Sequence, residues 1–309
     1  MTQEFTGCLI DHEVTAEVVA RMESDGMIVG YGASKPSLVG WYKRQVSRGV
    51  IKSLAQDSEF KVNGKMRKAY RQSGPVCVSR GTGGAIEDSY LFSLAGRSVV
   101  GVPVEIATEP IYGGARIAIG KGRLGNKGGA YGCNAAEYVS RYGVVSRGKY
   151  GSIDLTESND DLAGQWGAPQ AGVPKLIQDA SLSHEVSAHK VDSTEELADA
   201  IWAGYFGAVC RSMYSSAVDG DGFGIFNNQG GHCTEVSGAY INSRGRLCFV
   251  EQQSHGSGRP TMNPIAKTDS CDIPLRDGSY PVRMEDMATA IQTGECWVFS
   301  VKTGSEFRN

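Results

Sequence analysis

The chain has 309 residues, of which 40% are hydrophobic and 21% are charged, and its formal net charge is −3. This length is enough for one large domain or two smaller domains with well-buried cores. Because 31 basic side chains are balanced by 34 acidic ones, there is no electrostatic reason to expect a nucleic acid or an anionic membrane as a partner. The 41 glycines favour many turns and close backbone approaches over a helical bundle.

The beginning of the chain shows no pattern typical of a targeting or membrane segment. Residues 1–18 are acidic and polar, whereas a secretory signal is basic and then apolar. No apolar run in the chain reaches the roughly 18 residues that a membrane helix needs. We therefore expect cytoplasmic synthesis without a signal peptide. We expect residues 1–71, with a short helix at 15–22 and a loop at 30–42, to be an N-terminal extension that packs on the main domain, 72–309.

The eight cysteines have no spacing typical of a metal site. No two of them form a CxxC pair, which makes a zinc site an unfavourable interpretation. In a reducing cytosol most of them would be small buried hydrophobic side chains rather than disulfide partners. The sequence thus predicts neither a metal nor another cofactor. The cysteines are Cys8, Cys77, Cys133, Cys210, Cys233, Cys248, Cys271 and Cys296.

Helical patterns dominate the part of the chain that follows the extension. Apolar residues recur near the helical period from residue 78 to residue 95, and Gly96 would end this helix. The glycines at 81, 83 and 84 are poor helix formers, so the packing there must require small residues. A glycine-rich loop is expected over 101–126. A second short helix is expected over 134–142, with Gly143 as its C-cap.

Strand patterns dominate the last third of the chain. They follow a helix that Ser193 would cap, with Glu196 completing a capping box, and that runs to about residue 203. Strands are predicted at 208–213, 233–241, 247–252 and 295–301, and the turn at 242–246 joins two of them as a hairpin. The sequence therefore predicts an α+β architecture. A helical subdomain at about 72–190 would pack against a β-rich subdomain at about 191–309.

Four segments that could carry chemistry occur in one order along the chain. The first places Cys77 at the entry to a helix, shortly after Gln72. The second contains a pair of glycines, and the third places His232 after another such pair at the start of a strand. The fourth follows the hairpin and begins with Gln253. They read Gln72-Ser73-Gly74-Pro75-Val76-Cys77-Val78-Ser79, Asn126-Lys127-Gly128-Gly129, Gly230-Gly231-His232-Cys233 and Gln253-Ser254-His255-Gly256-Ser257-Gly258.

This order resembles that of the papain-like cysteine peptidases. In that family a Gln precedes the nucleophilic Cys, the Cys opens a long helix, and a Gly-Gly segment then lines the substrate cleft. A His opens a later strand, and an Asn-Ser-Trp-Gly segment follows a hairpin. The resemblance covers about residues 71–258 and, more weakly, the last strand at 295–299. It implies a papain-like fold with the cleft between the helical half and the β-rich half.

The resemblance also implies a role for each residue in the hydrolysis of peptide bonds. Cys77 would be the nucleophile, because a helix N-terminus and a nearby imidazolium favour the thiolate that attacks a carbonyl. His232 would act as general base and then as general acid, and Gln253 would orient its ring. Gln72 would donate an amide N–H to the developing oxyanion. The residues lining the site for a peptide or protein substrate would be Gly128, Gly129 and Gly231.

Other residues offer alternatives to these assignments. Cys133 also begins a helix and is the rival nucleophile, but it follows the glycine pair, where the family has a structural helix. His255 would be either the catalytic imidazole in place of His232 or a ring that shields the Cys–His pair. The segment from Asp219 to Gly222 favours a tight turn over a calcium loop, because the later ligands of an EF-hand are missing.

Departures from the family pattern support a second hypothesis. Val76 and Val78 flank Cys77 where the family has Ser and Trp, and Gln253 replaces the Asn, adding a rotatable bond that holds an imidazole less rigidly. The chain would then be a papain-fold structural or assembly component with weak or no peptidase activity. Such domains resemble proteins of tailed bacteriophages, where they can be virion components. Residues 1–71 would then mediate contacts in a homo-oligomer or with other virion proteins.

Overall fold

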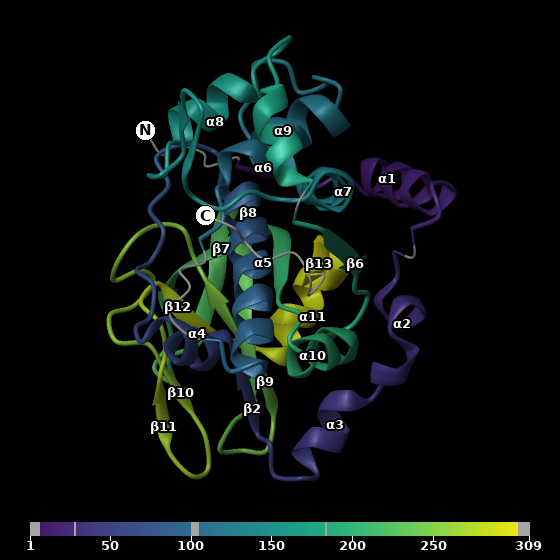
Figure 1. Cartoon of the computed structure of the whole chain (residues 1–309). Helices are drawn as coiled ribbons and strands as arrows, with labels where there is room; N and C mark the ends of the chain where they lie inside the picture. The colour runs from purple at the N-terminus through teal and green to yellow at the C-terminus, as the bar shows by residue number, and fades with distance from the viewer. Residues whose placement is uncertain (1–6, 28, 100–104, 183, 302–309) are drawn as a thin grey trace.

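One long helix, α5 (Cys77–Gly96), runs between the two halves of the molecule (Figure 1). The structure is a computed structural model, and it describes residues 7–27, 29–99, 105–182 and 184–301. Above α5 in Figure 1 lies a group of short helices, and behind it lies a large sheet. The predicted α+β architecture is confirmed, and so is the helix predicted from 78 to 95.

The sheet is antiparallel, and its strands follow the order β12-β9-β8-β7-β13-β6. A further short strand, β2, pairs with β8 beside this path. Two strands were predicted with their observed bounds, whereas β7 and β8 are longer than expected because they continue as one hairpin around residues 219–222. The strands are β2 (Lys52–Leu54), β6 (Val186–Lys190), β7 (Gly207–Val218), β8 (Gly224–Ile241), β9 (Leu247–Gln252), β12 (Ser279–Arg283) and β13 (Glu295–Val301).

Helices cover both faces of this sheet, and β8 shows the alternation that separates them. Cys233 and Glu235 point toward α5, because side chains added at Gly81 and Gly84 would meet them. Val236 belongs instead to the core on the other face, with α10 (Thr194–Trp202) and α11 (Met284–Thr293). A Cβ at position 81 would lie 2.9 Å from the Cys233 Sγ, and one at position 84 would overlap the Glu235 carboxylate. The glycines of α5 therefore allow the helix to approach the sheet closely.

The helical group contains elements where a loop was predicted. The expectation of loop over 101–126 is wrong for α6 (Glu109–Gly114) and for the π-helical turn Ala115–Ile119 that follows it, while 100–104 lie outside the described residues. The glycines misled the prediction because they serve packing: a Cβ at Gly114 would overlap the ring of Tyr138. The remaining helices of this group are α7 (Gly132–Tyr142), α8 (Asp160–Trp166) and α9 (Lys175–Ser181). Small two-residue strands, β3 (Ala130–Tyr131), β4 (Lys149–Tyr150) and β5 (Ile153–Asp154), lie between them.

Residues 7–27 and 29–71 run along the molecule from the helical group to the lower end of the sheet. Helix α1 (His12–Ser24) contains the predicted helix at 15–22 and packs against α7. The loop expected at 30–42 is wrong in part, because short helical turns fill most of it. The segment also supplies β2 to the sheet and α4 to the face of α5. The helices and helical turns of this segment after α1 are α2 (Tyr31–Ser34), η1 (Pro36–Leu38), α3 (Trp41–Val46) and α4 (Ala55–Asn63).

The division at residue 71 and the subdomain boundary near 190 stay predictions. The strand β6 ends at Lys190 and pairs with β13.

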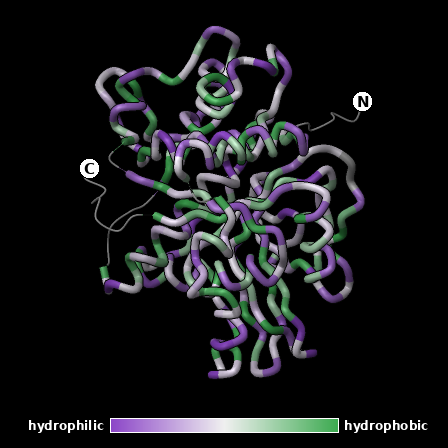
Figure 2. Tube along the Cα trace, turned by 90° about the vertical axis from the view of Figure 1, so that its right-hand side faces the viewer, coloured by the Kyte–Doolittle hydropathy of each residue, from purple (hydrophilic) through white to green (hydrophobic). Residues whose placement is uncertain are grey.

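The loops at the lower end of the molecule are mostly hydrophilic, as Figure 2 shows. Within the described ranges, no helix has the length and apolar character needed to cross a bilayer. Ser193 caps the helix that follows it as predicted, since the Glu196 N–H donates to the Ser193 hydroxyl at 3.1 Å. The predicted capping box is not completed, because the Glu196 carboxylate accepts from the Asp192 N–H at 2.8 Å.

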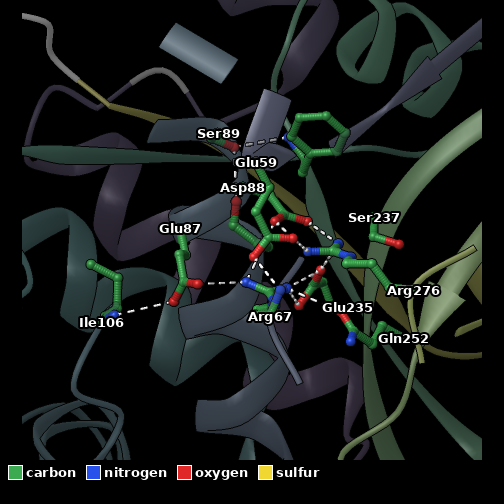
Figure 3. A network of polar contacts seen from close by, with 12 residues as sticks. Glu59, Arg67, Glu87, Asp88, Ser89, Ile106, Glu235, Ser237, Gln252 and Arg276 are labelled. Carbon is green, nitrogen blue, oxygen red and sulfur yellow. Dashed lines mark hydrogen bonds and ion pairs between the residues drawn. The ribbon is translucent and has the colours of Figure 1, made fainter. Parts of the chain in front are cut away.

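A buried ionic network fastens residues 59–67 to the main domain (Figure 3). Two guanidinium groups, Arg67 and Arg276, lie among four carboxyl groups from α4, α5 and β8. Burial raises the pKa of Glu235 well above its usual value, and its hydrogen bond to Asp88 acts in the same direction. Because the network has two guanidinium groups for four carboxyl groups, the protonated form of Glu235 is favoured. The carboxyl groups are those of Glu59, Glu87, Asp88 and Glu235.

Candidate active site

Cys77 is the first residue of α5 and is fully buried. Val76, the N-cap, offers no side-chain hydrogen bond to the helix, so the first backbone N–H groups of α5 are not capped from that position. The Cys77 thiol interacts with backbone N–H groups of Cys233, of Val78 and of its own residue. Cys233 follows His232 directly on β8, so the predicted nucleophile lies against the peptide next to the predicted imidazole.

The N-terminal segment covers this thiol. Strand β1 (Cys8–Leu9) pairs in parallel with β3, and the Ala130 N–H donates to the Gly7 carbonyl at 3.2 Å. A Cβ added at Gly7 would lie 2.6 Å from the Cys77 Sγ, so the chain crosses the sulfur at a distance that only glycine permits. No pattern in the sequence indicates this contact. The contact arises because the fold brings Gly7 across the Cys77 sulfur.

Burial dominates the electrostatics of Cys77. Removal from water raises the pKa of the thiol to about 12, although the surrounding backbone N–H groups act to lower it. In this arrangement the thiol is therefore protonated near neutral pH. The helix N-terminus and the backbone donors favour a thiolate only after water reaches the sulfur.

His232 lies on β8 among aromatic rings. Its ring stacks on His255 with 4.5 Å between the centroids, and the edge of Tyr214 meets it at 5.7 Å. Burial lowers the pKa of His232 well below its usual value, and the nearby His255 and Arg211 act in the same direction. The imidazole is thus neutral, the state in which it accepts a proton. Both predicted alternatives for His255, the catalytic imidazole and the shielding ring, stay predictions.

Two buried polar atoms near this ring have complementary needs. The Gln253 Nε2 donates to the Ser215 carbonyl, whereas the Gln253 Oε1 has no hydrogen-bond partner among the described residues. The His232 Nε2 likewise has none within the described ranges. An imidazole N–H and an amide oxygen would satisfy each other, which is the relation predicted for this pair. The orienting role of Gln253 stays a prediction.

Gln72 lies beside the segment that carries Gln253. Its backbone N–H donates to the Ser254 carbonyl at 2.8 Å, and its side-chain oxygen accepts from the Ser254 hydroxyl. Its amide nitrogen donates to the Gly74 carbonyl at 3.1 Å. One N–H of the predicted oxyanion donor is therefore engaged with the backbone, and its role at an oxyanion stays a prediction.

The three predicted substrate-binding glycines have different surroundings. Gly128 packs on Pro75, with its Cβ position 2.7 Å from the Pro75 Cγ. The backbone of Gly129 is engaged internally, because its N–H donates to the Tyr112 hydroxyl at 3.2 Å and its carbonyl accepts from Arg116. A Cβ at Gly231 would overlap the Cys8 carbonyl, so the N-terminal strand crosses there.

The residue that pairs with an extended segment is Ala130, one position beyond the predicted glycine pair. Sequence reasoning missed it because its contribution is a backbone N–H. Any residue other than proline offers that group, so no side-chain signal marks the position.

The remaining candidates lie apart from this arrangement. Cys133 is buried in α7, and burial raises the pKa of its thiol well above the usual value. The segment from Asp219 to Gly222 is a turn, with the Gly222 N–H bonded to the Asp219 carbonyl at 3.0 Å. In the part of the chain that the structure describes, no group of three or more His, Cys, Asp or Glu side chains is arranged to hold a metal ion.

Comparisons with known proteins bear on the fold. No family model matches the sequence, and no curated protein matches it significantly. Among solved structures, xylellain, a cysteine protease from Xylella fastidiosa, is 13% identical, with a TM-score of 0.54 over 82% of this chain and 86% of its own. The cysteine protease and lectin-like domains of Cwp84, a surface layer associated protein of Clostridium difficile, are 14% identical, with a TM-score of 0.50 over 86% of this chain and 60% of theirs. The chain has the papain-like fold.

Proposed function

We propose that the protein is a cysteine peptidase in which Cys77 is the nucleophile and His232 is the general base and acid. The observation that carries the proposal is the path of the chain's own first residues. Gly7 to Leu9 lie extended across the Cys77 sulfur, paired with Ala130 on one side and packed on Gly231 on the other. The space that Gly7 to Leu9 occupy, called the groove below, holds an extended polypeptide backbone against a thiol and is suited to a peptide or protein substrate.

The reaction follows from the groups around that groove. His232 accepts the proton of the Cys77 thiol, and the sulfur forms a bond to the carbonyl carbon of the substrate. The oxyanion accepts hydrogen bonds from the N–H groups at the start of α5 and, after the Gln72 side chain rotates, from its amide. The C–N bond breaks as His232 returns its proton to the leaving amine. Water then hydrolyses the thioester, with His232 as base, and the thiol is restored.

Activity on this scheme requires the N-terminal segment to leave the groove. Displacement would expose the Cys77 sulfur to water, and the loss of burial would bring its pKa down. A single substitution tests this in the full chain. Gly7→Leu places a side chain where only 2.6 Å separates its Cβ from the Cys77 Sγ, so the segment must move.

The experiment measures hydrolysis of fluorescently labelled, denatured casein by the full-length protein. We expect the Gly7→Leu variant to hydrolyse it faster than the natural sequence, and we expect Cys77→Ser to abolish hydrolysis in both backgrounds. Gly164→Ala is the matched control, because its Cβ would meet nothing within 4 Å. If Cys77 in the Gly7→Leu variant reacts with iodoacetamide but casein stays intact, the proposal is wrong.

That last outcome would favour the second candidate, an assembly component built on the same fold and, in the setting predicted from sequence, part of a phage virion. The observation that supports it is the buried, protonated Cys77 under a well-packed chain segment. A ring or other closed oligomer in analytical ultracentrifugation would then be expected, with contacts through residues 1–71. A monomer that cleaves casein would exclude this candidate.

A further inference from the structure

Three thiols that the proposed chemistry does not use meet where the N-terminal segment crosses the sheet. Cys210 on β7 and Cys233 on β8 are direct partners across the hairpin. Cys8, on β1, lies over both of these strands. The Cys210 thiol interacts through side-chain hydrogen bonds with both Cys8 and Cys233. All three are free thiols and are buried.

The walls of this cluster hold the thiols together. Gly132, which follows the strand that pairs with β1, has its Cβ position 2.7 Å from the Cys210 Sγ. Gly81 on α5 has its Cβ position 2.9 Å from the Cys233 Sγ. Glycine at both positions leaves the space that the sulfur atoms fill. The cluster therefore lies where β1 crosses β7 and β8.

We propose that Cys8 and Cys210 form a reversible disulfide that fastens the N-terminal segment over Cys77. Cys8 is the member of the cluster that belongs to the covering segment, and Cys210 is the thiol with which it interacts most closely. A bond between Cys8 and Cys210 would tie β1 to β7 at the position next to Gly7. A bond between Cys210 and Cys233 would only join two strands that are already paired, and would leave the segment free.

The chemistry needs an oxidant, which we take to be a peroxide. A peroxide oxidises one thiolate to a sulfenic acid, and the second thiol attacks that sulfur, forming the S–S bond and releasing water. The balance is two thiols and one hydrogen peroxide giving one disulfide and two waters. A dithiol reductant reverses the reaction by thiol–disulfide exchange. Because the thiols are buried in the closed form, the first step proceeds when the segment opens briefly.

The control of hydrolysis that follows rests on the proposed function, whereas the bond itself does not. Trypsin separates the cysteines concerned onto different peptides, so the bond can be identified without any activity assay. Cys8 falls on the peptide 1–21, Cys210 on 191–211, Cys233 on 212–244 and Cys77 on 72–80.

The test treats the full-length protein with hydrogen peroxide, blocks free thiols under denaturing conditions, and maps linked tryptic peptides by mass spectrometry. We expect 1–21 linked to 191–211, with the link lost after dithiothreitol. In the native protein, oxidation should slow the alkylation of Cys77 by iodoacetamide about tenfold or more, and reduction should restore it. Linkage of 191–211 to 212–244 instead, or no linked peptide, would overturn the proposal.

Variants separate protection by the proposed Cys8–Cys210 disulfide from direct oxidation of Cys77. In Cys8→Ser and Cys210→Ser, peroxide should leave the alkylation rate of Cys77 unchanged. Cys248→Ser is the matched control, because Cys248 is equally buried but lies on β9 and is outside the cluster. It should show the same protection as the natural sequence. Protection that persists in Cys8→Ser would mean that the segment is not held by this bond.

Discussion

Two of the junctions between the main domain and the described part of residues 7–71 have opposite character. At the first, β1 crosses Cys77 through two paired residues and a close backbone approach, and its nearest side-chain partners are thiols. At the second, Arg67 enters a buried network that includes Arg276 and carboxyl groups from three helices and strands (Figure 3). The first junction offers few interactions to break, whereas the second leaves uncompensated charge if any member departs. The covering segment is therefore expected to open while the network stays intact.

The largest expected effect comes from breaking the ionic junction. Arg276→Met removes a guanidinium that binds Asp88 at 2.7 Å and Glu235 at 2.9 Å while fully buried. Loss of one partner from such a network costs about 3–5 kcal/mol of unfolding free energy. Urea denaturation followed by circular dichroism measures it. The control is Arg244→Met, whose ion pair with Asp221 is exposed and should be worth less than about 1 kcal/mol. Equal stabilities of the two variants would show that the second junction is no stronger than a surface contact.

A second effect concerns Glu295, a buried carboxyl that lies near the Cys210 thiol. Burial raises the pKa of Glu295 to about 8, and Cys210 acts in the same direction. Because the folded state holds the proton more tightly than the unfolded chain, the stabilisation is complete below the ordinary Glu pKa of about 4.5. It is lost as the pH rises toward 8, by about 1.4 kcal/mol per pH unit from this group.

Glu295→Gln tests this effect, because Gln keeps the shape and an acceptor oxygen but does not titrate. We expect the unfolding free energy of the variant to fall less steeply between pH 5 and 8 than that of the natural sequence, as measured by urea denaturation at several pH values. The exposed Glu285→Gln serves as the control and should keep the natural slope. An unchanged slope in Glu295→Gln would place the titrating group elsewhere.

The fold could be predicted because its signals are local. The α5 pattern, the Ser193 cap and the apolar strand patterns at 247–252 and 295–301 are properties of short segments, and the order of four motifs then favoured one architecture. The helix that fills 109–119 escaped prediction because glycine reads as loop unless a partner such as Tyr138 is known to press on it. Close packing between distant segments leaves no trace in local periodicity.

The site could be predicted only as a set of residue types. The order of the motifs placed Cys77 next to the strand of His232, but not the cover formed by Gly7, which depends on where the first residues run. The sequence also offered Gly129 as a backbone partner, whereas Ala130 pairs with β1. The thiol cluster was invisible for the same reason, because Cys8, Cys210 and Cys233 are separated by long stretches of chain and no spacing rule links them.

A third effect measures the weakness of the covering junction directly. In Gly7→Leu, the reaction of Cys77 with iodoacetamide should accelerate about tenfold or more, because the segment spends more time off the sulfur. The unfolding free energy should fall by only about 1 kcal/mol, since the variant loses a two-residue strand pairing. Mass spectrometry of the peptide 72–80 gives the rate, with Gly164→Ala as control. A loss of stability as large as that of Arg276→Met would mean that the two junctions open together.

The smallest expected effect lies at the edge where the extension ends. The backbones of Arg71 and His255 form an isolated antiparallel β-bridge. The His255 ring stacks on His232 and contributes to the lowering of the His232 pKa. His255→Ala removes that neighbour and admits water, so the pKa of His232 should rise toward its usual value. A ¹H–¹³C NMR titration of the imidazole Cε1–H measures it, and His12→Ala, at the exposed start of α1, is the control. Because the folded pKa of His232 is depressed, the natural protein loses stability as the pH falls below the unfolded value of about 6.5, and His255→Ala should lose less of it. If the titration of His232 does not move, burial by β7 and β8 alone sets its neutral state, and His255 serves only to cover the ring.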